Sequence, residues 1–290
     1  MAVQPHDSAP NRQMDTIRRV IPASLWEITR SNWHTLRRAA QFPAAAFHPW
    51  RRISKKHLAG LKDAHFGQRC FIIGNGPSLK HTDLTLLKDE ITFGMNRIYL
   101  LFPELGFTTT YYLSVNDLVI QQCAEEILNL TMPKFLSWRS RRYLREMIRE
   151  GGSLPDNPPL IFLHTTYTGP KFAPDARSRL WEGATVTFVA LQLAYHMGFR
   201  QVILIGVDHS FSTKGKPNST VVSEGDDPDH FSGNYFGKGF RWQLPDLETS
   251  EQAYRMAYEA YLKSGREVLD ATIGGKLQVF PKVEYLSLFD

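Results

Sequence analysis

The chain has 290 residues, of which 42% are hydrophobic, and a formal net charge of +5. This length and composition indicate a soluble globular protein with one large or two small domains, each able to bury a core. Two cysteines, Cys70 and Cys123, exclude a disulfide framework and fit a reducing compartment.

The first part of the chain carries the basic charge. Residues 1–56 hold ten Arg and Lys against three Asp and Glu, which leaves a net charge of −2 for the remainder. Aromatic residues such as Trp26, Trp33 and Trp50 alternate with these arginines. We therefore predict a basic, partly disordered, helical arm over 1–64, followed by one domain over 65–290.

The sequence leaves two interpretations of the arm open. It lies on an anionic bilayer surface at the inner face of the cell membrane, or it packs its aromatic side chains on the body or on another subunit of a homo-oligomer. Nucleic acid is not an expected partner, because no recognised fold or stacking motif accompanies the charge. We expect a cytoplasmic protein, since Met1–Gln13 lacks the apolar core of a signal peptide and no apolar run reaches the roughly 18 residues of a membrane span.

Strands and helices alternate through the body, which predicts a mostly parallel sheet with helices on both faces. The predicted strands are Arg69–Ile73, Ile91–Met95, Thr110–Val115, Lys134–Trp138, Leu160–His164, Gln201–Gly206 and Glu267–Leu269. The predicted helices are Leu79–Leu87, Leu118–Leu130, Ser140–Arg149, Ala184–Met197 and Leu247–Lys263.

A small-residue turn follows the first strand of the body. Gly74 and Gly76 permit close approach of a ligand, Pro77 suits a first helical turn and Ser78 is a candidate cap. Amides at such a turn attract an anion or a ribose phosphate, and Asn75 adds a side-chain amide. An ordinary tight turn between strand and helix explains the glycines equally well.

Two further strands end in asparagine. Asn96 follows the second strand, and Asn116, with Asp117, follows the third. The carboxyl ends of parallel strands meet at one edge of a sheet, so the three asparagines are expected to line one pocket. Each of them also suits a turn or a helix cap.

A long irregular stretch, 210–245, follows the strand that ends in Gly206, Val207, Asp208 and His209. Loops of this length in a compact domain are usually lids or binding loops. We expect this segment, termed the lid, to cover the edge at which the asparagines lie.

Several motifs together resemble a known family. They are Gly74–Leu79, Met95–Asn96, Val115–Asn116, Glu182–Thr185 and Gly206–Asp208. Over roughly 65–290 the chain resembles the MptE-like (6-hydroxymethylpterin diphosphokinase-like) domain, which also occurs in bacterial motility accessory factors. It is more distantly similar to bacterial CMP-sialic-acid-dependent sialyltransferases, whose fold is a Rossmann-like variant of the GT-A type.

The sialyltransferase resemblance implies a cytidine nucleotide bound by the first turn and the three asparagines, with further contacts near Gly183, Thr185 and Asp208. It implies that a lid histidine, here His230, removes the acceptor proton. His209 is the rival, and a solvated loop histidine held by Asp227 or Asp229 is the alternative. Tyr235 or Tyr167 would contact the departing phosphate. That role is in doubt, since His209, Ser210 and Phe211 stand where the sialyltransferases carry tyrosines.

Three functions compete. The first is a glycosyltransferase that takes a nucleotide-sugar donor, a CMP-activated acidic sugar, and a glycan or protein acceptor, and needs no metal. The second is a pyrophosphokinase acting on a pterin, which would need ATP and Mg²⁺ held by Asp208, Asp117 or the cluster Asp226, Asp227 and Asp229. The third is a non-catalytic nucleotide-binding scaffold.

Overall fold

The computed structural model describes residues 46–148 and 154–290, and Pro49–Asp290 form one compact unit. This unit begins with α4 (Pro49–Leu61), which the sequence analysis assigned to the arm. Trp50 of α4 stacks on Phe162, and Nη1 of the buried Arg51 donates to the Phe162 carbonyl at 3.0 Å. This end of the expected arm is thus packed on the body. Both interpretations of residues 1–45 lie outside the described residues.

The body is an α/β fold around one parallel sheet, as predicted. Its eight strands run in the order β10-β7-β1-β2-β3-β4-β5-β6, and every neighbouring pair is parallel. The strands are β1 (Arg69–Ile73), β2 (Thr92–Met95), β3 (Tyr111–Ser114), β4 (Lys134–Ser137), β5 (Leu160–Thr166), β6 (Arg179–Trp181), β7 (Gln201–Ile205) and β10 (Glu267–Asp270). The seven predicted strands are confirmed within a few residues, and the short edge strand β6 was not predicted.

Two of the five predicted helices are confirmed, and the other three differ in type or extent. The helices α8 (Val186–His196) and α9 (Leu247–Lys263) are confirmed, whereas Leu118–Leu130 is divided at Cys123 into α6 (Asp117–Gln122) and α7 (Ala124–Asn129). Leu79–Leu87 is two 3₁₀ helices, Pro77–His81 and Leu84–Leu87, and Ser140–Arg149 is replaced by the 3₁₀ helix Trp138–Tyr143. The remaining helices are Ile98–Leu101 (3₁₀), α5 (Phe102–Leu105) and Leu286–Leu288 (3₁₀).

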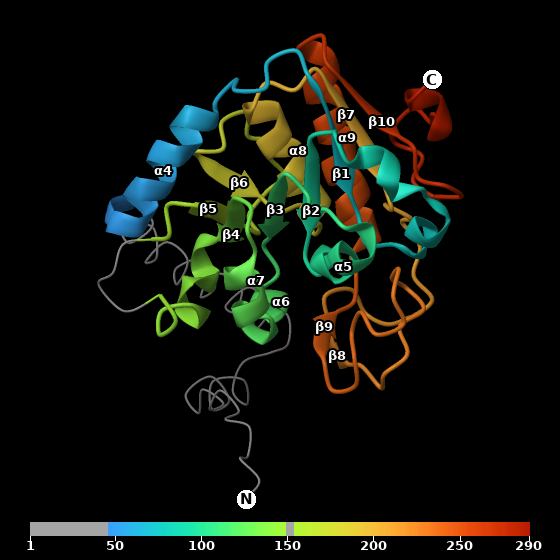
Figure 1. Ribbon diagram of the computed structural model, residues 1–290, viewed down its shortest axis with the longest axis horizontal. Coiled ribbons are helices and arrows are strands. Elements are labelled where there is room, and N and C mark those ends of the chain that lie inside the picture. The colour runs from blue at the N-terminus through green and yellow to red at the C-terminus, as the bar shows by residue number, and fades with distance from the viewer. Residues whose placement is uncertain (1–45, 149–153) are drawn as a thin grey trace, which may run out of the picture. The chain divides into compact units, whose positions relative to one another are not determined.

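Side chains on both faces of the central strands are buried, which explains why most residues of these strands are apolar. Cys70 and Ile72 of β1 join the main core, to which α8 and α9 contribute. Phe71, on the opposite face, stacks on Phe289 beside the last 3₁₀ helix, with ring centroids 5.7 Å apart. In Figure 1, α8 and α9 lie together behind the sheet. Helices on both faces are therefore confirmed.

The strand order reverses at β1, because β2 follows on one side and β7, far along the chain, pairs on the other. Such a reversal opens a crevice at the carboxyl ends of the strands. The lid lies at one end of the sheet, where its strands β8 (Thr220–Val222) and β9 (Arg241–Gln243) form an antiparallel pair (Figure 1). Among the described residues, none of the helices combines the length and apolar character needed to cross a bilayer.

Candidate functional site

The turn after β1 is pressed against the turn after β7. A Cβ at Gly74 would lie 2.1 Å from the Gly206 carbonyl oxygen, and one at Gly76 would lie 1.8 Å from Oδ2 of Asp208. The amides of both glycines donate within the protein, Gly74 to the Ile205 carbonyl at 2.8 Å and Gly76 to that of Gly206 at 2.9 Å. These glycines are required where two backbones approach each other, so the prediction that they make room for a ligand does not account for them.

Ser78 does not cap the short helix that follows, which corrects that prediction. Gly76 occupies the cap position, and Ser78 donates both its amide (3.1 Å) and its hydroxyl (2.7 Å) to the Asp208 carboxylate. Burial raises the pKa of Asp208 above its ordinary value, and the bonds from Ser78 oppose that shift. The carboxylate of Asp208 thus occupies the donors of Ser78 that the sequence analysis offered to an anion.

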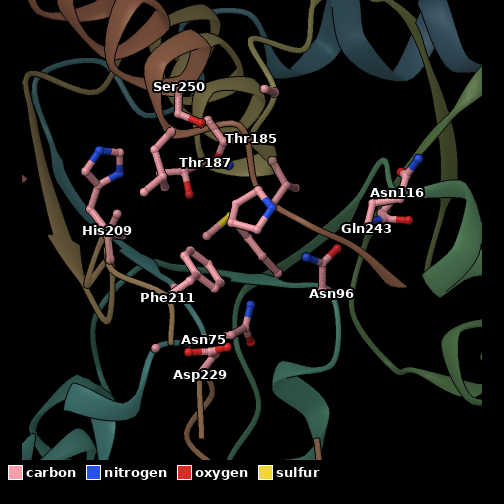
Figure 2. Close-up of a pocket in the computed structure, with 18 of the residues that line it drawn as sticks. Asn75, Asn96, Asn116, Thr185, Thr187, His209, Phe211, Asp229, Gln243 and Ser250 are labelled. Atoms are coloured by element: carbon pink, nitrogen blue, oxygen red, sulfur yellow. Dashed lines mark hydrogen bonds between the residues drawn. The ribbon is translucent and has the colours of Figure 1, made fainter. Parts of the chain in front are cut away.

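A cavity of about 260 Å³ lies at this edge of the sheet and brings the three asparagines together (Figure 2). Nine of the predicted site residues line it: Gly74, Asn75, Gly76, Asn96, Asn116, Thr185, Asp208, His209 and His230. Five others do not line it: Pro77, Ser78, Asp117, Gly183 and Tyr235. Lid residues including Phe211, Asp229, Trp242 and Leu244 form part of the wall, so the lid lies where the sequence placed it.

The asparagine amides have defined polarity. Oδ1 of Asn96 accepts from the Ser114 hydroxyl at 3.0 Å, and Oδ1 of Asn116 caps α6 by accepting from the Leu118 amide at 2.9 Å. The Nδ2 groups of both are therefore left as donors at the cavity. Asn75 is the reverse case, since its buried Oδ1 has no hydrogen-bond partner among the described residues. The cavity wall thus offers two amide donors, whereas the Asn75 oxygen is enclosed by the protein and has no partner within the part of the chain that the structure describes.

His230 enters the cavity wall from the lid. Both carboxylate oxygens of Asp227 lie 2.9 Å from its Nδ1, whereas Nε2 has no partner among the described residues. The His230 side chain is 12% exposed and that of Asp227 6%. His230 is accordingly neither free in solvent nor unpaired, but half of an Asp–His pair with one ring nitrogen left to accept a proton.

Tyr235 does not reach the cavity, which corrects its assignment as a phosphate contact. It is fully buried, its ring stacks on His230 with centroids 4.0 Å apart, and its hydroxyl accepts from the Arg97 amide at 3.2 Å. Burial raises the pKa of Tyr235 far above its ordinary value, so the hydroxyl stays protonated. Tyr167 does line the cavity.

His209 approaches from the β7 side, near hydroxyl groups at the N-termini of α8 and α9. Its Nε2 lies 3.2 Å from a carboxylate oxygen of Glu251, and its backbone has a φ of 55°. Thr185 caps α8 by accepting from the Thr187 amide. Figure 2 shows Thr185, Thr187 and Ser250 on the same side of the cavity as His209. A second histidine–carboxylate pair thus faces a group of hydroxyls.

The sequence analysis missed Arg139, which lines the cavity just beyond β4. Its guanidinium contacts both Glu182 oxygens, and its Nε lies 3.0 Å from Asp117. Burial by itself would lower the pKa of Arg139, but Glu182, Tyr167 and Asp117 raise it above its ordinary value. The strand-end rule that singled out the asparagines also applies to Arg139. Asp117 serves this ion pair and does not reach the cavity wall.

The carboxylates at and beside the cavity already have hydrogen-bond partners within the protein. No group of three potential metal ligands occurs among the described residues. The Asp229 oxygens accept from the amides and hydroxyls of both Ser212 and Thr213, which fills the four acceptor positions of a carboxylate. Asp227 holds His230, and Asp208 holds Ser78.

Comparison with known proteins identifies a family. The MAf glycosyltransferase from Magnetospirillum magneticum AMB-1 is a similar solved structure, with 15% identity and a TM-score of 0.48. The likeness covers 78% of this chain, which spans 35% of the length of that protein. A search among curated proteins finds no match. Residues 46–214 match the family described as 6-hydroxymethylpterin diphosphokinase MptE-like, which is more than half of the chain. The protein therefore belongs to the MptE-like family.

Proposed function

We propose that the protein is a nucleotide-dependent glycosyltransferase that uses a CMP-activated acidic sugar and transfers the sugar to a hydroxyl of a glycan or protein. The observation that carries the proposal is the meeting of three asparagines with His230, which Asp227 holds, in one cavity at the reversal of strand order. The proposal extends the implication of the sialyltransferase resemblance to these residues.

The polarity of the asparagines suits a pyrimidine base. Cytosine offers two acceptors, O2 and N3, which complement the Nδ2 groups of Asn96 and Asn116. Base contacts of this kind contribute specificity because a mismatched base leaves buried polar groups unpaired. The hydroxyls of Thr185, Thr187 and Ser250, with His209, would face the phosphate and replace the tyrosines expected there.

Net charge favours a donor with few phosphates. Among the described residues that line the cavity, Glu182, Asp208 and Asp229 are acidic and Arg139 is the only Arg or Lys, and Arg139 is already paired with Glu182. A triphosphate without a bound Mg²⁺ would meet more repulsion in this setting than a nucleoside monophosphate ester. A reaction that needs no triphosphate therefore suits the lining better than a metal-free kinase-like reaction.

His230 is the general base in this proposal. Its Nε2 takes the proton of the acceptor hydroxyl while the acceptor oxygen forms a bond to the anomeric carbon of the sugar. The bond between that carbon and the phosphate oxygen breaks, and CMP departs with the electron pair. Positioned bases of this kind contribute about 10²–10⁴-fold to rate.

A second candidate, pyrophosphoryl transfer to a pterin, is favoured by the description of the matched family. A non-catalytic nucleotide-binding scaffold is the third. Calorimetric titration of the full chain, together with an assay of CMP release from the donor, separates the three. Binding of CMP without Mg²⁺ and with turnover of the donor supports the transferase. Binding of ATP only with Mg²⁺ supports the kinase, and CMP binding without any turnover supports the scaffold.

The base is tested with CMP-N-acetylneuraminate as the donor probe and release of CMP as the measurement. His230→Ala should lower turnover by about 10²–10⁴-fold, with the circular dichroism spectrum of the folded protein retained. His81→Ala, at an exposed position away from the cavity, is the matched control. Retained turnover in His230→Ala, with loss in His209→Ala, would transfer the role to His209.

A further inference from the structure

The lid holds His230 from several sides, and the most specific of these contacts is the hydrogen bond to Asp227. Asp227 is buried, and its own carboxylate is fixed by two backbone donors, the Asp229 amide on Oδ1 at 3.0 Å and the Phe236 amide on Oδ2 at 3.2 Å. The same two oxygens lie 2.9 Å from Nδ1 of His230. These two backbone hydrogen bonds fix the orientation of the Asp227 carboxylate relative to the imidazole ring.

The ring plane of His230 is fixed independently. Tyr235 stacks on one face with an interplanar angle of 4°, and Phe236 meets the ring edge-on at a centroid distance of 4.8 Å. Tyr235 is itself held by Arg97, whose guanidinium contacts the Tyr235 carbonyl and whose amide donates to the hydroxyl. Arg97 directly follows Asn96, so the lid histidine is braced against the β2 end of the cavity.

We propose that Asp227 is the positioning residue of the site. It keeps His230 in the tautomer that carries its proton on Nδ1, leaves Nε2 unprotonated toward the acceptor, and stabilises the imidazolium formed when that proton is taken up. A carboxylate accepts and cannot donate when ionised, so Nδ1 must be the protonated nitrogen of a neutral ring beside it. The catalytic consequence rests on the proposed function, whereas the tautomer does not.

The tautomer can be measured without any substrate. Two-bond ¹H–¹⁵N correlations of the full chain labelled with ¹⁵N-histidine distinguish the two nitrogens, and loss of one signal set in His230→Gln assigns the residue. The wild-type protein should show His230 with protonated Nδ1 and unprotonated Nε2 at neutral to alkaline pH. A protonated Nε2 in the neutral ring would overturn the proposal.

Two lid variants then test the residue itself. Asp227→Asn should mix the two tautomers and lower CMP release from CMP-N-acetylneuraminate by about 10²-fold or more, with the KM for the donor changed little. Glu224→Gln, at an exposed position of the lid, is the matched control and should alter neither. Unchanged tautomer and turnover in Asp227→Asn would overturn the proposal.

The experiments distinguish three outcomes: a variant that does not fold, a protein that is not a transferase, and an Asp227 that does not position His230. If Asp227→Asn does not fold, the wild-type tautomer decides, and Asp227→Glu, which keeps the charge, should retain the Nδ1–H form. If the protein neither binds CMP nor releases it, the transferase proposal fails while the tautomer measurement still decides the role of Asp227.

Discussion

The close approach of the turns after β1 and β7 leads to a quantitative prediction for Gly74→Ala. A Cβ at position 74 would lie 2.1 Å from the Gly206 oxygen and 2.6 Å from its carbonyl carbon, where ordinary contact begins at 3.4 Å. The two turns would have to separate by roughly 1 Å. Overpacking of this kind costs about 1–3 kcal/mol, and weakening of the Gly74–Ile205 hydrogen bond adds about 0.5–1.5 kcal/mol.

The free energy of unfolding should therefore fall by about 2–4 kcal/mol, which for a domain of this size is about 4–16 °C in melting temperature. Urea unfolding followed by circular dichroism measures it. Gly60→Ala in α4, where no atom lies within 4 Å of the added Cβ, is the control and should cost nothing. If Gly74→Ala is as stable as Gly60→Ala but fails to bind CMP, the glycine serves a ligand and the reasoning from the two turns is refuted.

Three further changes have distinct expected outcomes. Asn75→Ala should weaken CMP binding by about 0.5–1.5 kcal/mol. The melting temperature should stay equal or rise, because the substitution removes a buried oxygen that has no partner among the described residues. A loss of stability in thermal unfolding would show a structural role for Asn75. Tyr235→Phe should keep CMP release near the wild-type rate, since the ring that stacks on His230 is retained, and a drop of 10²-fold would restore the hydroxyl to the reaction. Burial alone would raise the pKa of Asp229, but hydrogen bonds from Ser212 and Thr213 lower this pKa below its ordinary 3.8. The stability that Asp229 contributes is therefore present above pH 3.8 and is lost as the pH falls through the lower pKa of the folded state. Asp229→Asn should accordingly be less stable than wild type at pH 7, with the difference shrinking in acid unfolding curves below pH 3.8; a difference that persists there would contradict the assignment.

Strand positions and the meeting of the asparagines were predictable from the sequence for a clear physical reason. Buried parallel strands are continuously apolar, and their carboxyl ends share one edge, so Asn75, Asn96 and Asn116 had to lie near one another once the sheet was recognised. The same rule, applied to the residues after Lys134–Ser137, would have found Arg139.

Contacts between segments that are distant in the sequence could not be predicted, because local sequence patterns carry no information about them. The acceptor for Ser78 is Asp208, 130 residues away, and a single sequence gives no sign of that pairing. Tyr235 looked like a loop residue with an available hydroxyl, whereas the aromatic side chains of the lid form a small buried cluster of their own around it. The 3₁₀ helices also had no distinct signal, because short apolar runs of this kind resemble α-helical turns.

The pairing of β1 with both β2 and β7 has a consequence for biosynthesis. One edge of β1 is covered by the next strand to be made, but the other must wait for Gln201–Ile205, about 130 residues later. At a ribosomal rate of about 5–20 residues per second, the chain spends roughly 7–26 s with an open strand edge that is apolar after Arg69. Such an edge is a template for pairing with other chains, so we expect newly made protein to depend on chaperones or slow expression for its yield.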